Sequence, residues 1–323
     1  MSKTRVKPMV EWRHINWRKL ERRVFKLQKR IYRASQRGDL KALRRLQKTL
    51  MKSWSARCLA VRRVTPDNRG KKTAGVDGLK SLTPKQRLSL VANLKLSSKV
   101  APTRRVWIPK PGTQEKRPLG IPTMNDRALQ ALVKLALEPE WEARFEPNSY
   151  GFRPGRSCHD AIEQIFTAIS QKAKYVLDAD IAKCFDRINH EALLNKLNTF
   201  PTIRRQVRAW LKSGVVYPQM LETSEGTPQG GVISPLLANI ALHGMENRIT
   251  QYIETLPGNR RNNRKSLSLI RYADDFVILH EDTTVVQRCR EILSEWLKGM
   301  GLELKPSKTR LAHTLNDYEG NGT

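Results

Sequence analysis

The stretch that most constrains the fold of this chain is Tyr272-Ala273-Asp274-Asp275, which lies between the apolar runs 267–271 and 276–279. Strand-forming residues on both sides of a pair that tolerates turn conformations predict a strand, a tight turn and a second strand. Such a hairpin presents two carboxylates at its tip. Exposed acidic turns are common, so a simple solvated turn is the alternative interpretation of this stretch taken alone.

A second acidic strand is predicted at 175–181, where Asp180 follows an apolar run. If this strand lies beside the hairpin, Asp180 and Asp274 converge, and carboxylates that close repel each other unless a cation lies between them. Oxygen ligands with few His or Cys residues nearby favour Mg²⁺. A pair of such ions can activate a 3′-hydroxyl and stabilise the leaving pyrophosphate, which is the chemistry of a nucleic-acid polymerase.

The charge of the chain indicates a polyanionic partner. The 323 residues include 60 Lys and Arg against 30 Asp and Glu, a net charge of +30. This excess is far larger than solubility requires, so nucleic acid held by salt-sensitive phosphate contacts is the expected partner. The alternative is a soluble protein that is merely basic.

The remaining composition excludes several classes of protein. The four cysteines, at positions 58, 158, 184 and 289, are far apart and form no CxxC motif. A zinc site or a disulfide framework is therefore not expected, in keeping with a reducing cytoplasm, bacterial or organellar. The N-terminus has no apolar leader, and no run approaches the ~20 apolar residues that a membrane span needs.

Residues 1–72 form a basic segment that predicts an αα-hairpin. Leu20, Val24, Leu27 and Ile31 have helical spacing, Gly38 ends this helix, and Asp39 can cap the next. The second helix is expected to bury Leu40, Leu43, Leu46, Leu50 and Trp54. Acidic residues are few here, whereas a solvated charged face usually mixes both signs, so we expect RNA binding. The candidate contacts are Arg22, Arg23, Lys29 and Arg30.

Five blocks follow one another in order along the chain. They are Gly120 to Thr123, Tyr150 to Ser157, Asp180 to Asp186, Gly226 to Gly231, and Tyr272 to Asp275. Together they resemble the reverse transcriptase/maturase family encoded by group II introns, over roughly residues 75 to 313. Any one block is common, but the ordered set of five is highly specific.

The resemblance implies an α/β (α+β) fold with the right-hand architecture of polymerases. We expect a basic helical extension at 1–72 that binds RNA, fingers at 73–174, and a palm at 175–323, with part of the fingers interleaved around 190–230. The palm would be an antiparallel sheet backed by helices. The chain ends before the thumb, maturase and endonuclease segments of the family, so weak duplex binding and poor processive synthesis are expected.

The resemblance also implies the metal site. Asp180, Asp274 and Asp275 would be catalytic, and with Ile181 they would hold two Mg²⁺ ions, for which Mn²⁺ can substitute. Asp178 is also acidic and shares a strand face with Asp180. The choice of Asp180 follows the family pattern and not the spacing, and Asp186 is expected to be structural.

Nucleotide contacts are implied in the same way. Lys110 and Arg117, on a predicted hairpin, would hold the triphosphate, and a guanidinium can clamp phosphate oxygens bidentately. Phe185 would be a steric gate against ribonucleotides, with core packing as the alternative. Gln229 and Gly230 would lie near the nucleotide, and Lys308 would lie near the leaving pyrophosphate. Ordinary exposed basic residues are the alternative for Lys110 and Arg117.

The glycine-rich block at 150–157 is expected to form a loop before a helix. Arg153 and Arg156 could hold template phosphates there, and its glycines would let the backbone approach a ligand closely. A loop that merely ties two helices is the alternative.

The expected reaction is RNA-templated DNA synthesis from deoxynucleotides. The partners would be group II intron RNA, template RNA, a DNA primer or target, and dNTPs, without a membrane. In the resembled family the same protein also folds its intron RNA for splicing and copies it during retrohoming. The alternatives are a non-catalytic RNA-binding splicing cofactor and a reverse transcriptase of a retron or defence system. An RNA-templated RNA polymerase is disfavoured by Phe185.

Overall fold

The chain divides into two compact units. The computed structural model describes residues 11–67, 73–97, 99–109, 112, 114, 116–217, 219–221, 225–227 and 229–316. Unit 1 comprises Met1–Ala143, Ser213–Leu221 and Gly230–Ile233, and unit 2 comprises Arg144–Lys212, Glu222–Gln229 and Ser234–Thr323. Which parts serve as fingers and which as palm stays a prediction.

Unit 1 begins with helices whose ends follow from their capping residues. Its elements are η1 (Trp12–His14), α1 (Trp17–Gln36), α2 (Leu40–Lys52), α3 (Trp54–Val64), α4 (Pro84–Asn93) and α5 (Met124–Glu142), with strands β1 (Thr103–Pro109), β2 (Lys116–Ile121), β4 (Val215–Tyr217) and β5 (Gln219–Leu221). Asp39 caps α2 by accepting from Ala42 N at 2.9 Å. Thr83 and Gln86 form a capping box at α4. The cap that the sequence predicts at Asp39 is therefore confirmed.

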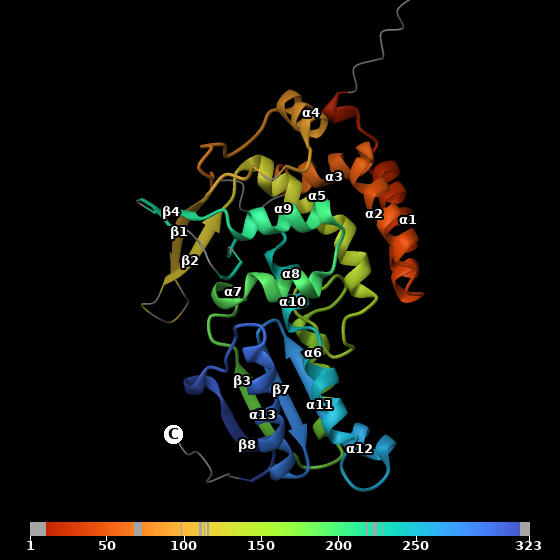
Figure 1. Cartoon of the computed structure of the whole chain (residues 1–323), viewed down its shortest axis with the longest axis vertical. Helices are drawn as coiled ribbons and strands as arrows, with labels where there is room; N and C mark the ends of the chain where they lie inside the picture. The colour runs from red at the N-terminus through yellow and green to blue at the C-terminus, as the bar shows by residue number, and fades with distance from the viewer. Residues whose placement is uncertain are drawn as a thin grey trace, which may run out of the picture. The chain divides into compact units, whose positions relative to one another are not determined.

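Helices α1, α2 and α3 pack around α5, as Figure 1 shows. α5 contains Pro139, whose missing N–H leaves the carbonyl of Leu135 without its usual helical donor. The side chain of Gln28 on α1 donates to that carbonyl at 3.1 Å, and Gln47 on α2 donates to the carbonyl of Ala136 at 3.2 Å. Side-chain amides from α1 and α2 therefore donate hydrogen bonds to backbone carbonyls of α5 in the turn that Pro139 interrupts.

The second N-terminal helix is shorter than its apolar pattern predicts. α2 ends at Lys52, because Ser53 adopts an extended backbone, and Trp54 begins the separate helix α3. Leu43 and Leu50 are buried, but Leu40 and Trp54 are 49% and 43% exposed. The expected αα-hairpin is thus a three-helix arrangement, and the sequence-based assignment of Trp54 to the second helix was wrong.

The hairpin predicted near Arg104–Leu119 is confirmed by β1 and β2, which pair antiparallel. β4 joins β1 in parallel and β5 continues the sheet, so that the strand order is β2-β1-β4-β5. The parallel pairing brings residues about 110 positions apart together: Thr103 N donates to the carbonyl of Gly214 at 3.0 Å.

Unit 2 is built on a four-stranded antiparallel sheet. Its strands are β3 (Tyr175–Asp180), β6 (Ser268–Tyr272), β7 (Asp275–His280) and β8 (Arg310–His313), in the order β6-β7-β3-β8. Its helices are α6 (Cys158–Ile169), α7 (Cys184–Arg187), α8 (His190–Leu197), α9 (Pro201–Leu211), α10 (Ser234–Leu242), α11 (Met245–Ile253), α12 (Arg260–Ser266) and α13 (Thr283–Lys298), with η2 (Pro306–Lys308). The predicted antiparallel sheet backed by helices is confirmed.

The two faces of this sheet are covered by different helices. α13 packs on β3 and β7, and α11 lies against α13 (Figure 1). On the other face, α6 packs through Ala161 against Ile270 and Leu279. Because side chains alternate along a strand, Asp275 shares this second face with Leu279 but lies at the opposite end of β7.

Throughout the part of the chain that the structure describes, every helix is too short or too polar to cross a bilayer.

Candidate active site and nucleic-acid interface

The acidic turn, Ala273-Asp274 followed by Asp275, connects β6 to β7. Tyr272 pairs directly with Asp275, so the turn has two residues, and the predicted strand–turn–strand is confirmed. The φ angle of Ala273 is +60°. Such hairpin positions favour Gly, Asn or Asp, and a strained non-glycine backbone costs about 1–3 kcal/mol unless its surroundings hold it. The turn therefore depends on the residues packed behind it.

Gly151 is one of those residues. A Cβ at Gly151 would lie 2.3 Å from the Ala273 nitrogen and 2.9 Å from its Cα. Asn239 Nδ2 donates to the Gly151 carbonyl at 2.8 Å and fixes this backbone in place. Sequence reasoning expected the glycines of the 150–157 block to approach a ligand, but Gly151 approaches the acidic turn of the same chain.

Gly151→Ala is expected to destabilise unit 2 by about 1–3 kcal/mol, because the added methyl overlaps backbone that cannot move freely. Urea unfolding of the variant and the wild type measures this. Gly299→Ala, in the same unit, is the matched control: its φ is −60°, which alanine adopts without strain, and its Cβ position lies 3.4 Å from the Trp296 carbonyl oxygen, an ordinary van der Waals contact. Equal losses of stability in the two variants would contradict the steric argument.

Asp180 lies directly across the ladder from Asp275. Directly opposed residues of an antiparallel pair share a face, with Cα atoms about 4.5–5.5 Å apart. The predicted placement of this strand beside the hairpin is confirmed. Asp178 shares the face but lies opposite Arg310 of β8, whose Nη2 reaches its Oδ2 at 3.1 Å. The two aspartates, which their spacing could not distinguish, therefore differ in their partners: Asp180 faces a carboxylate of the turn, and Asp178 pairs with Arg310.

The carboxylates of the turn are crowded by burial and by each other. Burial, then the charges of Asp275 and Asp180, raise the pKa of Asp274. Burial and the charge of Asp180 likewise raise the pKa of Asp275. Lys308 Nζ lies 3.0 Å from Asp180 Oδ2, and this hydrogen bond and charge raise the pKa of Lys308. Negative charge thus accumulates at the end of the sheet, where a cation relieves the repulsion.

The donors present suit a hard divalent cation bound together with substrate. Among the residues in the described ranges, no three His, Cys, Asp or Glu side chains are arranged to hold one metal ion. Mg²⁺, however, is usually held by one or two carboxylates, with water and substrate phosphates completing its shell. The facing pair Asp180 and Asp275, beside Asp274, meets that requirement with oxygen ligands.

Ile181 can contribute only its backbone carbonyl to such a site. Ile181 forms an isolated antiparallel β-bridge with Leu304. The hydrogen bonds of this bridge join the neighbouring residues: Lys305 N donates to the Asp180 carbonyl at 2.8 Å, and Ala182 N donates to the Glu303 carbonyl at 2.9 Å. Neither bond uses the Ile181 carbonyl. A strand is indicated by the sequence at 302–304, but the structure forms only this single bridge there.

Phe185 lies in the short helix α7, immediately after this region. Its ring meets the edge of Phe152, with centroids 6.1 Å apart, and Phe152 has a φ of +61°. The carbonyl of Phe185 accepts from Thr227 N. Gly226 lies so close to Asp186 that a Cβ would be 2.5 Å from the Asp186 oxygen. Phe185 is half-buried, and its ring contact with Phe152 and its backbone hydrogen bond with Thr227 restrict its movement.

The two arginines of the 150–157 block have different environments. Arg153 is 7% exposed, donates to the carbonyls of Glu146 and Ser149, and stacks on Phe145. Such a guanidinium ties the loop together and leaves little surface for a template, which argues against the expected template contact. Arg156 is half-buried over Tyr150 and donates to Pro147. It stays a candidate.

The remaining predicted nucleotide contacts are distributed over both units. Arg117 is an exposed residue of β2 in unit 1, and Lys110 lies outside the described residues. Gln229 is half-buried in unit 2, and the next residue, Gly230, belongs to unit 1. The φ of Gly230 is +109°, and its Cβ position is 3.0 Å from the Gly120 carbonyl, so this glycine packs against backbone.

The four predicted RNA contacts on α1, Arg22, Arg23, Lys29 and Arg30, are all exposed. Two aromatic side chains accompany them on the helix surface: Phe25 is 60% exposed under Lys29 Nζ, and Tyr32 is 37% exposed. Exposed aromatic rings beside cations can stack on unpaired bases while the cations contact phosphates.

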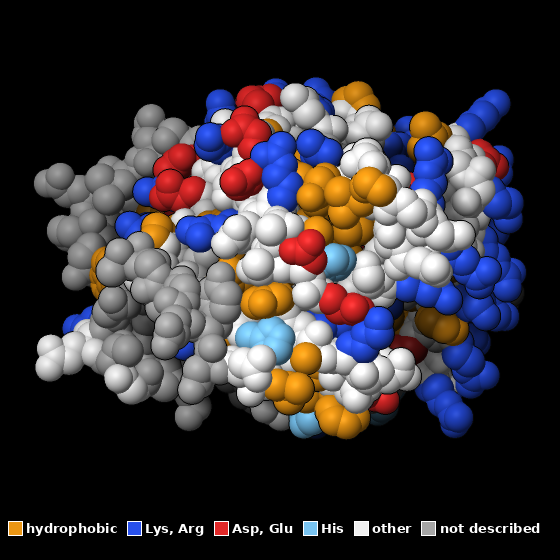
Figure 2. Space-filling view, turned by 90° about the horizontal axis from the view of Figure 1, so that it is seen from below, with side chains coloured by type: hydrophobic (Ala, Val, Ile, Leu, Met, Phe, Trp, Pro, Cys, Tyr) orange, Lys and Arg blue, Asp and Glu red, His pale blue; other side chains and the backbone are white. Residues whose placement is uncertain are grey.

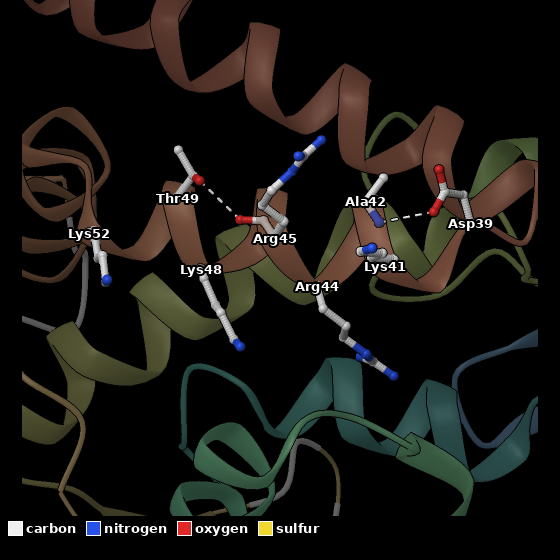
Figure 3. Close-up of a pocket in the computed structure, with 8 residues that line it drawn as sticks. All are labelled: Asp39, Lys41, Ala42, Arg44, Arg45, Lys48, Thr49 and Lys52. Atoms are coloured by element: carbon white, nitrogen blue, oxygen red, sulfur yellow. Dashed lines mark hydrogen bonds between the residues drawn. The ribbon is translucent and has the colours of Figure 1, made fainter.

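A second basic surface, on α2, was missed by sequence reasoning. The α2 basic row consists of Lys41, Arg44, Lys48 and Lys52, spaced three, four and four residues apart, which is one face of a helix. It lines a hollow of about 640 Å³, and Arg44 and Lys48 extend to the same side of α2 (Figure 3). Arg44 also lies 3.7 Å from the buried Glu140. The spacing was present in the sequence and could have identified the row.

A space-filling view also shows basic side chains gathered on the surface. On the face drawn in Figure 2, Lys and Arg form a dense band along one edge, and acidic side chains lie mainly outside it. A band of one sign concentrates polyanions near the protein.

Comparison with known proteins agrees with the sheet and its acidic turn. The family described as reverse transcriptase (RNA-dependent DNA polymerase) matches residues 108–320, and the N-terminal domain of reverse transcriptase matches residues 12–94. Protein YkfC of Escherichia coli K12 is 32% identical over 298 residues, covering 79% of this chain and 76% of YkfC. The chain therefore belongs to the reverse transcriptase family.

Relatives encoded by introns are also similar. Group II intron-encoded protein LtrA of Lactococcus lactis is 36% identical over 191 residues, covering 57% of this chain and 32% of LtrA. Maturase-like protein 1 of Euglena gracilis is 31% identical over 245 residues, covering 72% of this chain and 51% of that protein. The resemblance to group II intron reverse transcriptases is confirmed, and the chain spans about a third of LtrA.

A solved structure shares the fold. An apo telomerase from Candida tropicalis, truncated from its C-terminal domain, superposes with a TM-score of 0.53 over 68% of this chain and 52% of the telomerase. The identity is 13%, so the likeness concerns the fold alone.

Proposed function

We propose that this chain is the RNA-directed DNA polymerase of a group II intron, which copies intron RNA into DNA and, as a maturase, assists splicing of that RNA. The observation that carries the proposal is the pairing of Asp180 with Asp275 beside Asp274, in a chain of the reverse transcriptase family. Reverse transcriptases as a family depend on divalent metal ions.

The proposed metal-binding residues are Asp180, Asp274, Asp275 and the carbonyl of Ile181. Two bound Mg²⁺ ions, or Mn²⁺ in their place, would activate the primer 3′-hydroxyl and stabilise the leaving pyrophosphate. The chain itself would position these oxygen ligands, and the close packing of Gly151 on Ala273 would help to hold the turn in place. Lys308, whose Nζ lies 3.0 Å from Asp180 Oδ2, would donate a proton near the leaving group.

The proposed nucleotide contacts are Lys110, Arg117, Phe185, Gln229 and Gly230. The two basic side chains would hold the triphosphate, and Phe185 would fill the space that a ribose 2′-hydroxyl needs. The contacts of Phe185 with Phe152 and Thr227 support the gate, because a discriminating side chain must resist displacement by the larger sugar.

Phe185→Ala is expected to raise ribonucleotide incorporation, relative to deoxynucleotide incorporation, by about 10- to 200-fold, the range for a steric difference of one small group. Single-nucleotide addition with each rNTP and dNTP measures the ratio. Phe166→Ala is the control, since Phe166 is an exposed residue on α6. An unchanged ratio in Phe185→Ala would leave core packing as the role of Phe185.

The proposed RNA interface comprises the four cations of α1 and the α2 basic row. Neither helix has an acidic residue in its first turn, and Asp39 is occupied in capping α2. Repeated cations on one helix face suit successive phosphates and carry no sequence information themselves. Arg156 is the proposed template contact in unit 2.

Addition of one dNTP to a DNA primer on an RNA template, with Mg²⁺, tests the proposal without requiring processive synthesis. We expect templated addition that EDTA abolishes. RNA binding without any addition would favour the non-catalytic splicing cofactor. Addition without preference for group II intron RNA over unrelated structured RNA would favour a reverse transcriptase of the retron or defence type.

A further inference from the structure

A fully buried arginine supports the acidic turn from behind. Arg271, near the end of β6, is 1% exposed. Its Nη1 donates to the carbonyl of Ala273 at 2.8 Å and to Asn239 Oδ1 at 3.1 Å, and its Nη2 donates to Ser149 Oγ at 2.7 Å. One guanidinium thus joins the turn to α10 and to the segment before the 150–157 block.

Burial of this charge is expensive for folding. Desolvation lowers the pKa of Arg271 to about 10, although the charge of Glu146 partly offsets it. Replacing buried charged groups with well-packed apolar residues is often neutral or stabilising. The contribution of Arg271 is therefore better sought in geometry: a rigid planar fork fixes several acceptors at once, which an apolar side chain cannot do.

The backbone around Arg271 is held by the same segment. Arg271 N donates to the carbonyl of Asn148, and Tyr150 N donates to the carbonyl of Arg271, both at 2.9 Å. Asn239 connects Arg271 to Gly151: its Oδ1 accepts a hydrogen bond from Arg271, and its Nδ2 donates one to the Gly151 carbonyl. Gly151 in turn packs on Ala273, the strained residue of the turn. Arg271 and Gly151 thus both contact Ala273, and the segment 148–151 holds both of them.

We infer that Arg271 is a positioning residue of the polymerase, which clamps the Ala273 carbonyl through Ser149 and Asn239 and so aims the carboxylates of Asp274 and Asp275. The inference rests on the proposed function for its kinetic readout only. Displacing reacting groups by about 1 Å can cost on the order of 10²-fold in rate. A clamp on the backbone of the turn therefore has a large effect without touching substrate.

Arg271→Gln and Arg271→Lys test the clamp by single-nucleotide addition at varied Mg²⁺ and dNTP. We expect Arg271→Gln to lose about 10²-fold in kcat, to need more Mg²⁺ for half-maximal rate, and to keep its KM for dNTP. Arg271→Lys should recover part of the rate, because one ammonium can reach the Ala273 carbonyl but cannot hold all three acceptors.

Lys174→Met is the matched control. Lys174 is a buried cation in the same unit, and its Nζ donates at 3.2 Å to the carbonyl of Ser266, just before the other end of β6. The Lys174→Met substitution should lower the melting temperature of the protein without changing kcat per folded molecule. If Arg271→Gln fails to fold, Ser149→Ala removes only one of the three hydrogen bonds and should give a smaller change in the same direction.

Hydrogen–deuterium exchange supplies a readout that needs no catalysis. At equal folded fraction, the amides of 272–275 should exchange faster in Arg271→Gln than in Lys174→Met, and Mn²⁺ should raise the melting temperature of Arg271→Gln less than that of the wild type. Folded Arg271 variants with wild-type exchange, kcat and Mg²⁺ requirement would overturn the inference. An inactive wild type with faster exchange in Arg271→Gln would instead refute the proposed polymerase and leave the clamp.

Discussion

Asp274→Asn is expected to reduce single-nucleotide addition by at least about 10³-fold, which corresponds to about 4 kcal/mol of transition-state stabilisation. Asparagine keeps the size of the side chain but removes the negative charge that a metal ion needs. The carboxylate lies at the tip of the turn, where burial and two neighbouring carboxylates already raise its pKa. Removing it should not weaken the fold, so RNA affinity and melting temperature should be retained.

Asp178→Asn is the control for this prediction. Asp178 is on the same strand and the same face as Asp180, but it is 49% exposed on its side chain and paired with Arg310. Its substitution should change the rate only a few-fold, as expected for an exposed ion pair worth about 0–1 kcal/mol. Similar losses in the Asp178 and Asp274 variants would mean that the acidic strand end acts as a diffuse field and not as a metal site.

Removing the four cations of α1 is the second change with a large expected effect. Alanine at Arg22, Arg23, Lys29 and Arg30 should weaken binding of structured intron RNA on the order of 10²-fold, and should reduce the slope of log affinity against log salt by about 3. The reason is that each phosphate contact releases bound counterions. Filter binding over a range of KCl concentrations measures both quantities.

A matched set of substitutions controls for net charge. Alanine at Lys172, Arg288, Arg290 and Lys298 removes the same charge from exposed positions of unit 2. Three of these cations already face Glu281, Glu291 or Glu295. This set should leave the salt slope nearly unchanged. Equal effects of the two sets would show that RNA responds to overall charge and that α1 is no specific interface.

The elements that sequence could predict are those with strong local patterns. The apolar runs on both sides of Asp274 predicted the hairpin, and the cap at Asp39 predicted the start of α2, because both patterns depend on residues a few positions apart. Trp54 was misassigned since its spacing fits α2, whereas the extended backbone of Ser53 ends that helix. Local periodicity does not reveal such a break.

The parts of the site that escaped prediction depend on contacts distant in sequence. Asp178 and Asp180 differ only in what lies across the sheet, which the register with β7 and β8 decides. The burial of Arg153, and the packing of Gly151 on Ala273, depend on segments over 100 residues away or on the fold of the loop itself. Arg271 showed no signal as a clamp, because Asn239 and Ser149 reach it only in the folded chain.

The central claim is that Asp180, Asp274 and Asp275 hold divalent cations, and metal-directed cleavage tests it most directly. Fe²⁺ in place of Mg²⁺, with ascorbate and peroxide, cuts backbone near the bound metal. In the complex with RNA template, DNA primer and dNTP, we predict Mg²⁺-competed cuts within a few residues of 180 and of 274, absent in Asp274→Asn. Cuts confined to other segments, or cuts at these positions that persist in Asp274→Asn, would contradict the account.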